Sequence, residues 1–231
     1  MHAAWDGVFA ATAVAWSGIV AALVLRQACR RFMRPLVYVA FLALGLLAVF
    51  DLLPASKAAL TWPVLLVAVA LGYGTFWCVG RYVAPICPAC AMRRFESDDH
   101  HAHGGGLIAL AIVLGIHCFL DGLGMSAAST VDASVGIRVV SGMAIHKLPE
   151  GFALGMILMA GGRSAWRAFA VATAIEAATL GGPLTTTVWT NPSGFWLSLV
   201  LAYLGGTFLY LSATGLWEAL GRLPPMSAVR T

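Results

Sequence analysis

The sequence predicts an all-α membrane protein, a polytopic bundle of about seven spanning helices in a single membrane domain. The composition is the first observation behind this prediction, because 60% of the 231 residues are hydrophobic and only 10% are charged. Soluble domains carry about 25% charged residues. The second observation is that the charges stand in clusters between long uncharged runs, each near the roughly 20 residues that a helix needs to cross a bilayer. An ordinary soluble domain is therefore excluded.

Seven apolar runs reach the required length. We expect spanning helices at residues 7–25, 36–54, 62–83, 106–130, 136–160, 165–188 and 194–216. Tryptophans such as Trp62 and Trp189 stand near the ends of these runs, where an interfacial aromatic belt places them. The first run precedes its positive cluster, which reverses the order of a signal peptide, so we expect it to remain as a spanning helix.

Lysines and arginines alternate between the predicted loops. The loop after the first run holds four arginines and the next holds one lysine, and this alternation continues to the C-terminus. The positive-inside rule then places the N-terminus outside and the C-terminus in the cytoplasm. We expect an integral protein of the bacterial inner (plasma) membrane. The net charge of +4 comes from arginines at the ends of the runs, so no nucleic-acid partner is expected.

Two predicted helices each carry a histidine and a carboxylate four residues apart, His117 with Asp121 and His146 with Glu150. Positions i and i+4 lie on one face of a helix. A short outer loop at residues 130–137 makes the two helices antiparallel neighbours. Two imidazoles and two carboxylates form a ligand set that suits zinc and other first-row metals. The alternative is a buried polar network that joins helices, but ionisable residues rarely persist in a span without pairing or function.

Further polar residues surround these pairs. Lys147 would repel a second divalent ion, and we expect it to pair with Glu150 or Glu176, which predicts one metal ion per chain. Pro149 removes a backbone donor inside the fifth run and is predicted to interrupt that helix, as in helices that line ion sites. Asp51 ends the second run, where it is either a solvated end residue or part of the metal's entrance or exit.

The segment at residues 84–105 is a long polar interruption, which the charge pattern places in the cytoplasm. It contains a CPAC motif followed by three histidines, and its potential metal ligands are Cys87, Cys90, His100, His101 and His103. These residue types suit zinc, but their spacing matches no closed zinc finger. We interpret the segment as a weak surface metal site, with a redox CxxC motif or an inert loop as alternatives. The other cysteines, Cys29, Cys78 and Cys118, lie in or beside apolar runs and are interpreted as small buried residues.

The motifs resemble those of the ZIP (Zrt/Irt-like) family of divalent-metal transporters. HKLPEG at residues 146–151 is similar to that family's H-x-x-P-E-G core, and HCFLDG at residues 117–122 is similar to its H-N-x-x-(D/E)-G core. AIEAATLGGP resembles the segment that supplies a further carboxylate, here Glu176. Weaker similarities in the second and seventh runs extend the resemblance over residues 36–218.

The resemblance implies two adjacent metal positions. The primary transport site falls on four residues, His117, Asp121, His146 and Glu150. The neighbouring second site includes three, Cys118, Lys147 and Glu176. Cys118 stands where asparagine is usual and Lys147 stands where a ligand is often found, which favours one occupied site. Asp51 replaces the usual histidine of the second span. The family commonly has eight spans, whereas this sequence predicts seven. The family fold also implies a homodimer.

We therefore expect a transporter that moves a divalent transition metal into the cytoplasm, with Zn²⁺ first and Fe²⁺, Mn²⁺, Cd²⁺ and Co²⁺ as further substrates. The metal is the cargo, and no organic cofactor and no enzymatic activity are expected. The expected partners are the metal ion, the lipid bilayer and, by resemblance, a second copy of the chain. Two alternatives remain open, an intramembrane zinc-dependent hydrolase and a metal sensor that does not transport. The lack of an HExxH motif disfavours the hydrolase.

Overall fold

The computed structural model describes residues 2–24, 26–82, 104–160, 163–188 and 194–219. Within these residues the chain forms helices joined by short turns and no strand, which confirms the all-α prediction. The long helices are α1 (His2–Val24), α2 (Arg26–Leu47), α4 (Trp62–Tyr82), α6 (Gly104–Val131), α7 (Ala133–Ala160) and α10 (Gly194–Ala219). The shorter segments are η1 (Ala48–Leu52), α3 (Leu53–Lys57), α8 (Ala165–Glu176), η2 (Ala177–Leu180) and α9 (Gly181–Val188).

Six helical stretches of the described chain are long and apolar enough to cross a membrane. A helix satisfies its own backbone hydrogen bonds, which a hydrocarbon environment requires. These six stretches confirm a polytopic helical membrane protein. The remaining predicted span, residues 136–160, corresponds to α7, which has 28 residues but lies outside the group of six. Its charged residues, among them Lys147 and Glu150, lower its hydropathy.

Two predicted loops are wrong, because the chain is helical where loops were expected. Helix α2 begins at Arg26, so the arginine cluster lies on a helix, for which arginine has a favourable propensity. The loop expected at residues 130–137 is reduced to Asp132. Asp132 Oδ1 accepts hydrogen bonds from the backbone N–H groups of Ser134 (2.9 Å) and Val135 (3.0 Å), as an N-cap does. The hydrogen bond from the Ser134 hydroxyl holds the pKa of Asp132 below its usual range.

The predicted helix break at Pro149 is also wrong, because α7 continues through this residue. The interruption lies instead in the sixth span, where α8 ends at Glu176, the 3₁₀ segment η2 follows, and α9 completes the crossing. The tighter turn brings the backbone of η2 against α6. A Cβ atom on Gly122 would lie 1.8 Å from the carbonyl oxygen of Thr179, so only glycine fits at this contact.

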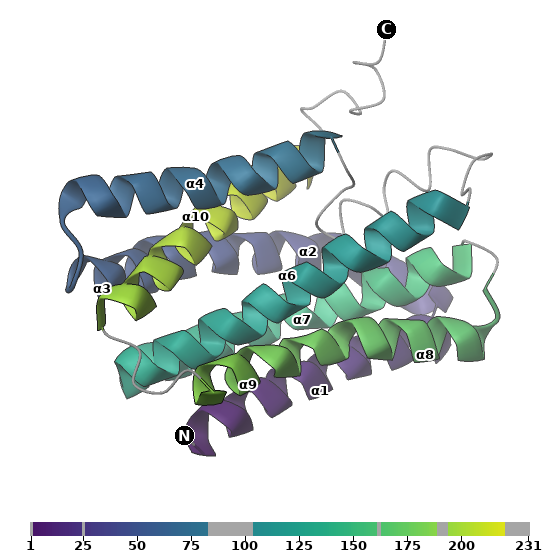
Figure 1. The fold of residues 1–231 in the computed structure, drawn as a ribbon. Coiled ribbons are helices and arrows are strands. Elements are labelled where there is room, and N and C mark those ends of the chain that lie inside the picture. Colours follow the sequence, from purple (N-terminus) through teal and green to yellow (C-terminus); the bar gives the residue numbers. More distant parts are fainter. Residues whose placement is uncertain (1, 25, 83–103, 161–162, 189–193, 220–231) are drawn as a thin grey trace, which may run out of the picture.

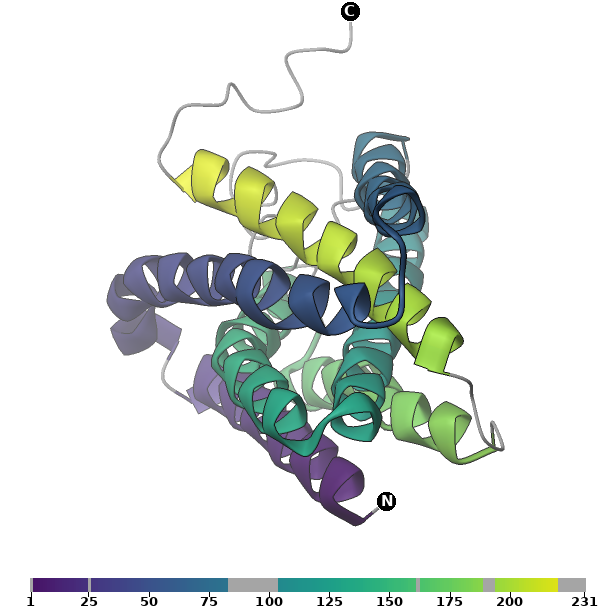
Figure 2. The same ribbon diagram turned by 90° about the vertical axis from the view of Figure 1, so that its left-hand side faces the viewer.

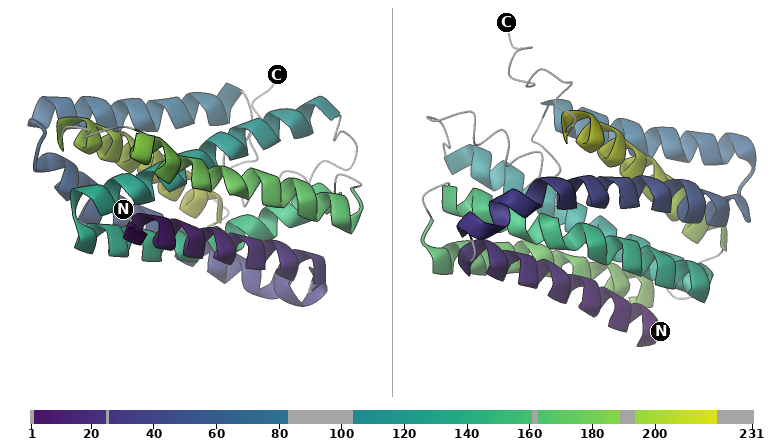
Figure 3. Two further views of the ribbon diagram at one scale, coloured as in Figure 1. Left: turned by 60° about the horizontal axis from the view of Figure 1, so that its bottom comes forward. Right: turned by 180° about the vertical axis from the view of Figure 1, so that it is seen from behind.

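The helices are arranged in two layers (Figures 1 and 2). We call α2, η1, α3, α4 and α10 the first layer, and α1, α6, α7, α8, η2 and α9 the second layer. In the first layer α4 packs along α10, and in the second α1 packs along α7. Helix α2 joins the layers by running over α7, as the view from behind shows (Figure 3).

Contacts within each layer are closer than contacts between the layers. In the second layer, a Cβ atom on Gly151 of α7 would lie 2.0 Å from the carbonyl oxygen of Ala15 in α1. In the first layer, a Cβ atom on Gly206 of α10 would lie 2.1 Å from the carbonyl oxygen of Val69 in α4. These helix pairs therefore touch backbone to backbone, the packing that small residues permit in membranes. Apolar side chains fill the space between the layers; examples are Phe41, Leu44, Leu47, Met125, Met143, Leu204 and Phe208.

Candidate metal site

The two predicted histidine–carboxylate pairs face one another across α6 and α7. His117 and Asp121 lie on α6, and His146 and Glu150 lie on α7. One ligand atom from each of the four buried side chains lies within 4.8 Å of the other three. His117 Nε2 is 3.6 Å from Asp121 Oδ2 and 3.5 Å from Glu150 Oε1, and His146 Nε2 is 3.5 Å from Glu150 Oε2. The structure thus brings together all four residues of the predicted primary site.

Many polar atoms of this group have no hydrogen-bond partner. They are His117 Nε2, both ring nitrogens of His146, both carboxylate oxygens of Asp121 and Glu150 Oε2. A buried polar atom left unsatisfied costs about 1–3 kcal/mol. A divalent cation among them would accept lone pairs from nitrogen and oxygen at once. The donor set therefore fits a first-row transition metal, which binds imidazole and carboxylate together.

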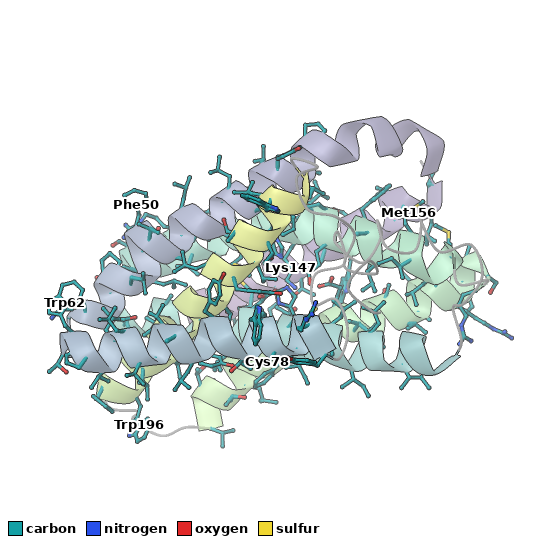
Figure 4. The ribbon with its side chains drawn as sticks, turned by 90° about the horizontal axis from the view of Figure 1, so that it is seen from above. Phe50, Trp62, Cys78, Lys147, Met156 and Trp196 are labelled. Carbon is teal, nitrogen blue, oxygen red and sulfur yellow. The ribbon has the colours of Figure 1, made fainter. Side chains whose placement is uncertain are left out.

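Lys147 places a positive charge at one edge of the four-residue group. Its Nζ lies 2.9 Å from both Asp121 Oδ2 and Glu150 Oε2, at ion-pair distance but without hydrogen-bond alignment, and it donates a hydrogen bond to Glu176 Oε2 at 3.2 Å. The expected pairing with Glu150 and Glu176 is present, and the contact with Asp121 is additional. Figure 4 shows Lys147 in the middle of the bundle.

Cys118 lies directly beside the same group. It is buried, as its apolar surroundings predict, but its thiol faces two carboxylates, donating to Glu150 Oε1 at 3.4 Å and to Glu176 Oε2 at 3.7 Å. Ligand atoms of Cys118, Glu150 and Glu176 form a second set within 4.8 Å of one another. Glu150 belongs to both sets. The second set contacts the ammonium group of Lys147 through both of its carboxylates.

Two aromatic side chains of the first layer lie over the histidines. The Phe41 ring of α2 has its centroid 6.4 Å from that of His146, and the Phe76 ring of α4 has its centroid 6.3 Å from that of His117. The ligands all come from the second layer, so the site faces the boundary between the layers. The sequence gives no signal for these two phenylalanines, because one apolar position in a span resembles another.

Asp51 lies apart from the four ligands. It sits in the π-helical turn η1, its side chain is 10% exposed, and its Oδ1 accepts a hydrogen bond from Arg138 Nε of α7. The alternative of a solvated end residue is therefore wrong. Arg138 precedes His146 by eight residues, which is about 12 Å along a helix. The structure thus places Asp51 near one end of the bundle and not at the metal site.

The remaining cysteine and histidine predictions have mixed outcomes. Cys78 was expected to be buried, but it is exposed on the surface of α4 (Figure 4). The predicted loop ligands lie outside the described residues; these are Cys87, Cys90, His100, His101 and His103. Cys29 lies on α2, and its side chain is not among those described. The weak loop site therefore stays a prediction.

No protein-family model and no curated protein sequence matches this chain. The family resemblance therefore rests on the sequence motifs alone.

Proposed function

We propose that this protein moves a divalent transition metal, Zn²⁺ first, across the membrane into the cytoplasm, and that it belongs to the ZIP family. One observation carries the proposal. Four buried nitrogen and oxygen ligands from two adjacent helices, His117, Asp121, His146 and Glu150, converge within 4.8 Å inside a bundle of membrane-length helices. Ionisable groups at such a depth are costly and mark ion pathways in membrane proteins.

The ligand chemistry favours a transported ion over a permanently held one. Structural zinc sites are closed by four cysteine or histidine ligands. This group uses two carboxylates, and it lies at the boundary between two layers of helices. The side chains that cover it from the first layer are the hydrocarbon rings of Phe41 and Phe76, which offer no ligand atom. An ion held on one side only by apolar rings can leave once the layers separate.

The position of Lys147 favours one ion per chain. Its ammonium group contacts Asp121, Glu150 and Glu176 and so lies where a second cation would sit beside the first. Two cations about 4 Å apart repel each other by several kcal/mol at the effective dielectric of a protein. The tethered charge therefore neutralises Glu176, which lies outside the four-residue group, and part of the charge of Asp121 and Glu150.

The two alternatives make different demands on the site. A zinc hydrolase keeps an open coordination position for water and a nearby general base. Here both carboxylates of the four-residue group contact Lys147, and an ion-paired carboxylate is a weaker base. A sensor would use the same ligands and bind metal without flux.

The decisive experiment is uptake of Zn²⁺, with Cd²⁺, Fe²⁺ and Mn²⁺ for comparison, into proteoliposomes. Glu150→Gln keeps the shape of the side chain but removes a charge shared by both ligand sets, so we expect uptake to fall at least about tenfold, the effect of losing about 1.4 kcal/mol of binding. Asp6→Asn, which removes an exposed carboxylate from α1, is the matched control and should transport normally.

Three other outcomes would contradict the proposal or favour one of the alternatives. Normal uptake by Glu150→Gln would refute the site. Tight metal binding by the wild type without any uptake would indicate the sensor. Lipid hydrolysis by the purified protein that a chelator abolishes would indicate the hydrolase.

A further inference from the structure

The boundary between the two layers differs physically from the contacts inside each layer. Inside the layers, the pairs α1–α7 and α4–α10 touch backbone to backbone, as at Gly151 and Gly206, whereas α2 meets α10 through side chains, as at Gly45 and Gly215. Across the boundary, Gly142 of α7 meets only the side chain of Leu47 in α2, whose Cδ1 would lie 2.4 Å from an added Cβ atom. Side chains can change rotamer, whereas carbonyl groups inside a helix cannot move without breaking its hydrogen bonds. The helix pairs α1–α7 and α4–α10 are thus firmer units than the contact between α2 and α7.

One ion pair crosses this boundary among those that join described residues. Arg138 of α7 donates to Asp51 of η1, and the other ion pairs, which involve the buried histidines and Lys147, stay within the second layer. The Asp51 side chain is 10% exposed and the Arg138 side chain is 53% exposed. The pair therefore lies at the rim of the bundle, where Asp51 is nearly buried and Arg138 is exposed.

Both partners are held in place by their own layers. Arg138 Nη1 donates to Ser134 Oγ at 3.3 Å, and the Ser134 hydroxyl donates to Asp132 Oδ1 at 2.5 Å, so the guanidinium is tied to the turn between α6 and α7. Asp51 lies in a single π-helical turn, a local widening of the helix that often occurs at functional sites. Leu52 and Leu53, which follow it, pack against Gly205 of α10.

We propose that the Asp51–Arg138 ion pair is a latch that holds the two layers together at this end of the bundle and keeps the buried metal site closed to water there. The inference rests on the proposed function, since it assigns to these two residues the control of passage to that site. The site lies about 12 Å further along α7. Breaking the pair lets the apolar side chains between the layers separate and exposes the site from this end.

The rate at which the Cys118 thiol is chemically labelled measures this opening. Cys118 is fully buried among side chains of the second layer, and its thiol lies 3.4 Å from Glu150 Oε1 of the site, so a water-soluble methanethiosulfonate reagent reaches it only when the site is open to water. The protein is reconstituted in nanodiscs without metal, with its other cysteines replaced by serine; these are Cys29, Cys78, Cys87 and Cys90. The rate of Cys118 labelling is then measured in this parent and in the latch variants.

We expect Cys118 to be labelled roughly fivefold faster in Arg138→Gln and in Asp51→Asn than in the parent. This factor corresponds to about 1 kcal/mol, the upper end of the free energy that a partly exposed ion pair contributes. The exchanged variant, Asp51→Arg with Arg138→Asp, restores the attraction with reversed charges and should return toward the parent rate. Lys57→Gln is the matched control, because Lys57 is a cation of the first layer that bonds to Leu60 and covers Trp62 without reaching α7.

Two results would overturn the latch. One is a labelling rate for both single variants within roughly twofold of the parent. The other is fast labelling that persists in the exchanged variant, which would show that packing and not charge sets the rate. If one single variant fails to fold, the other and the exchanged variant still decide. Labelling needs no metal, so a failure of metal uptake in the wild type counts against the proposed function and not against the latch.

Discussion

At the scale of single residues, the site combines ligands with a fixed counter-charge. Glu150 is the central residue, because its two oxygens face His117 and Cys118 on one side and His146 and Lys147 on the other. A carboxylate in this position can bind a metal only by sharing its charge with the ammonium group. The proposed function therefore implies that the Lys147 ammonium and the metal ion share the same carboxylates.

Lys147→Gln tests this balance. Removing the ammonium leaves three buried carboxylates without a cation, and breaking a buried ion pair in this way costs about 3–5 kcal/mol. We expect the metal-free variant to be less stable than the wild type and to bind two Zn²⁺ ions per chain in place of one, a change that metal analysis of the purified protein would detect. Lys57→Gln, at the exposed end of α3, should keep one ion. A variant that still binds one ion would contradict the role assigned to Lys147.

At the scale of helices, glycine contacts set how closely the elements of the site approach. Helix α1 carries none of the ligands, yet it packs along the whole of α7. Gly151, next to Glu150, is one of the points where the two backbones meet, and Gly18 of α1 is another. The position of α1 therefore fixes the height and rotation of the helix that supplies half of the ligands.

Gly151→Ala should move α1 away from α7. The added Cβ atom would lie 2.0 Å from a carbonyl oxygen of Ala15, and overpacking of this kind costs about 1–3 kcal/mol. We expect that loss in unfolding titrations of the protein in detergent micelles, together with weaker zinc binding. Gly74→Ala on α4 is the control, since its Cβ would meet nothing within 4 Å, and it should not destabilise the protein. Equal stability of the two variants would show that α1 adjusts without cost.

At the scale of the whole molecule, the ligands belong to the second layer and the rings over them belong to the first. A metal ion held by these residues would tie α6 to α7 within one layer and would leave the boundary between the layers without a ligand bond. A folded state that alone holds the ion is stabilised by mass action, by about 2.7 kcal/mol when the free ion is at about a hundredfold its dissociation constant.

Zinc should accordingly raise the thermal unfolding temperature of the wild type near neutral pH, and Glu150→Gln should show little of this increase. Metal ligands must be deprotonated, so protons compete with the ion. We expect the zinc-dependent increase to be smaller at about pH 5.5 than at about pH 7.5, because protons compete with the ion for its ligands. Differential scanning fluorimetry at both pH values, with and without zinc, checks this. An increase that is as large at the lower pH would mean that the histidines are not ligands.

The sequence by itself determined the fold class and the two ligand pairs. Apolar runs of spanning length define helices without reference to the rest of the chain, and a spacing of four residues places His117 beside Asp121 and His146 beside Glu150 on any helix. Only the tertiary structure decided how these helices are rotated and which side chains they share. It placed Lys147 against Asp121, covered the histidines with Phe41 and Phe76, and joined Asp51 to Arg138, because contacts between helices depend on packing across the bundle and leave no periodic signal along the chain.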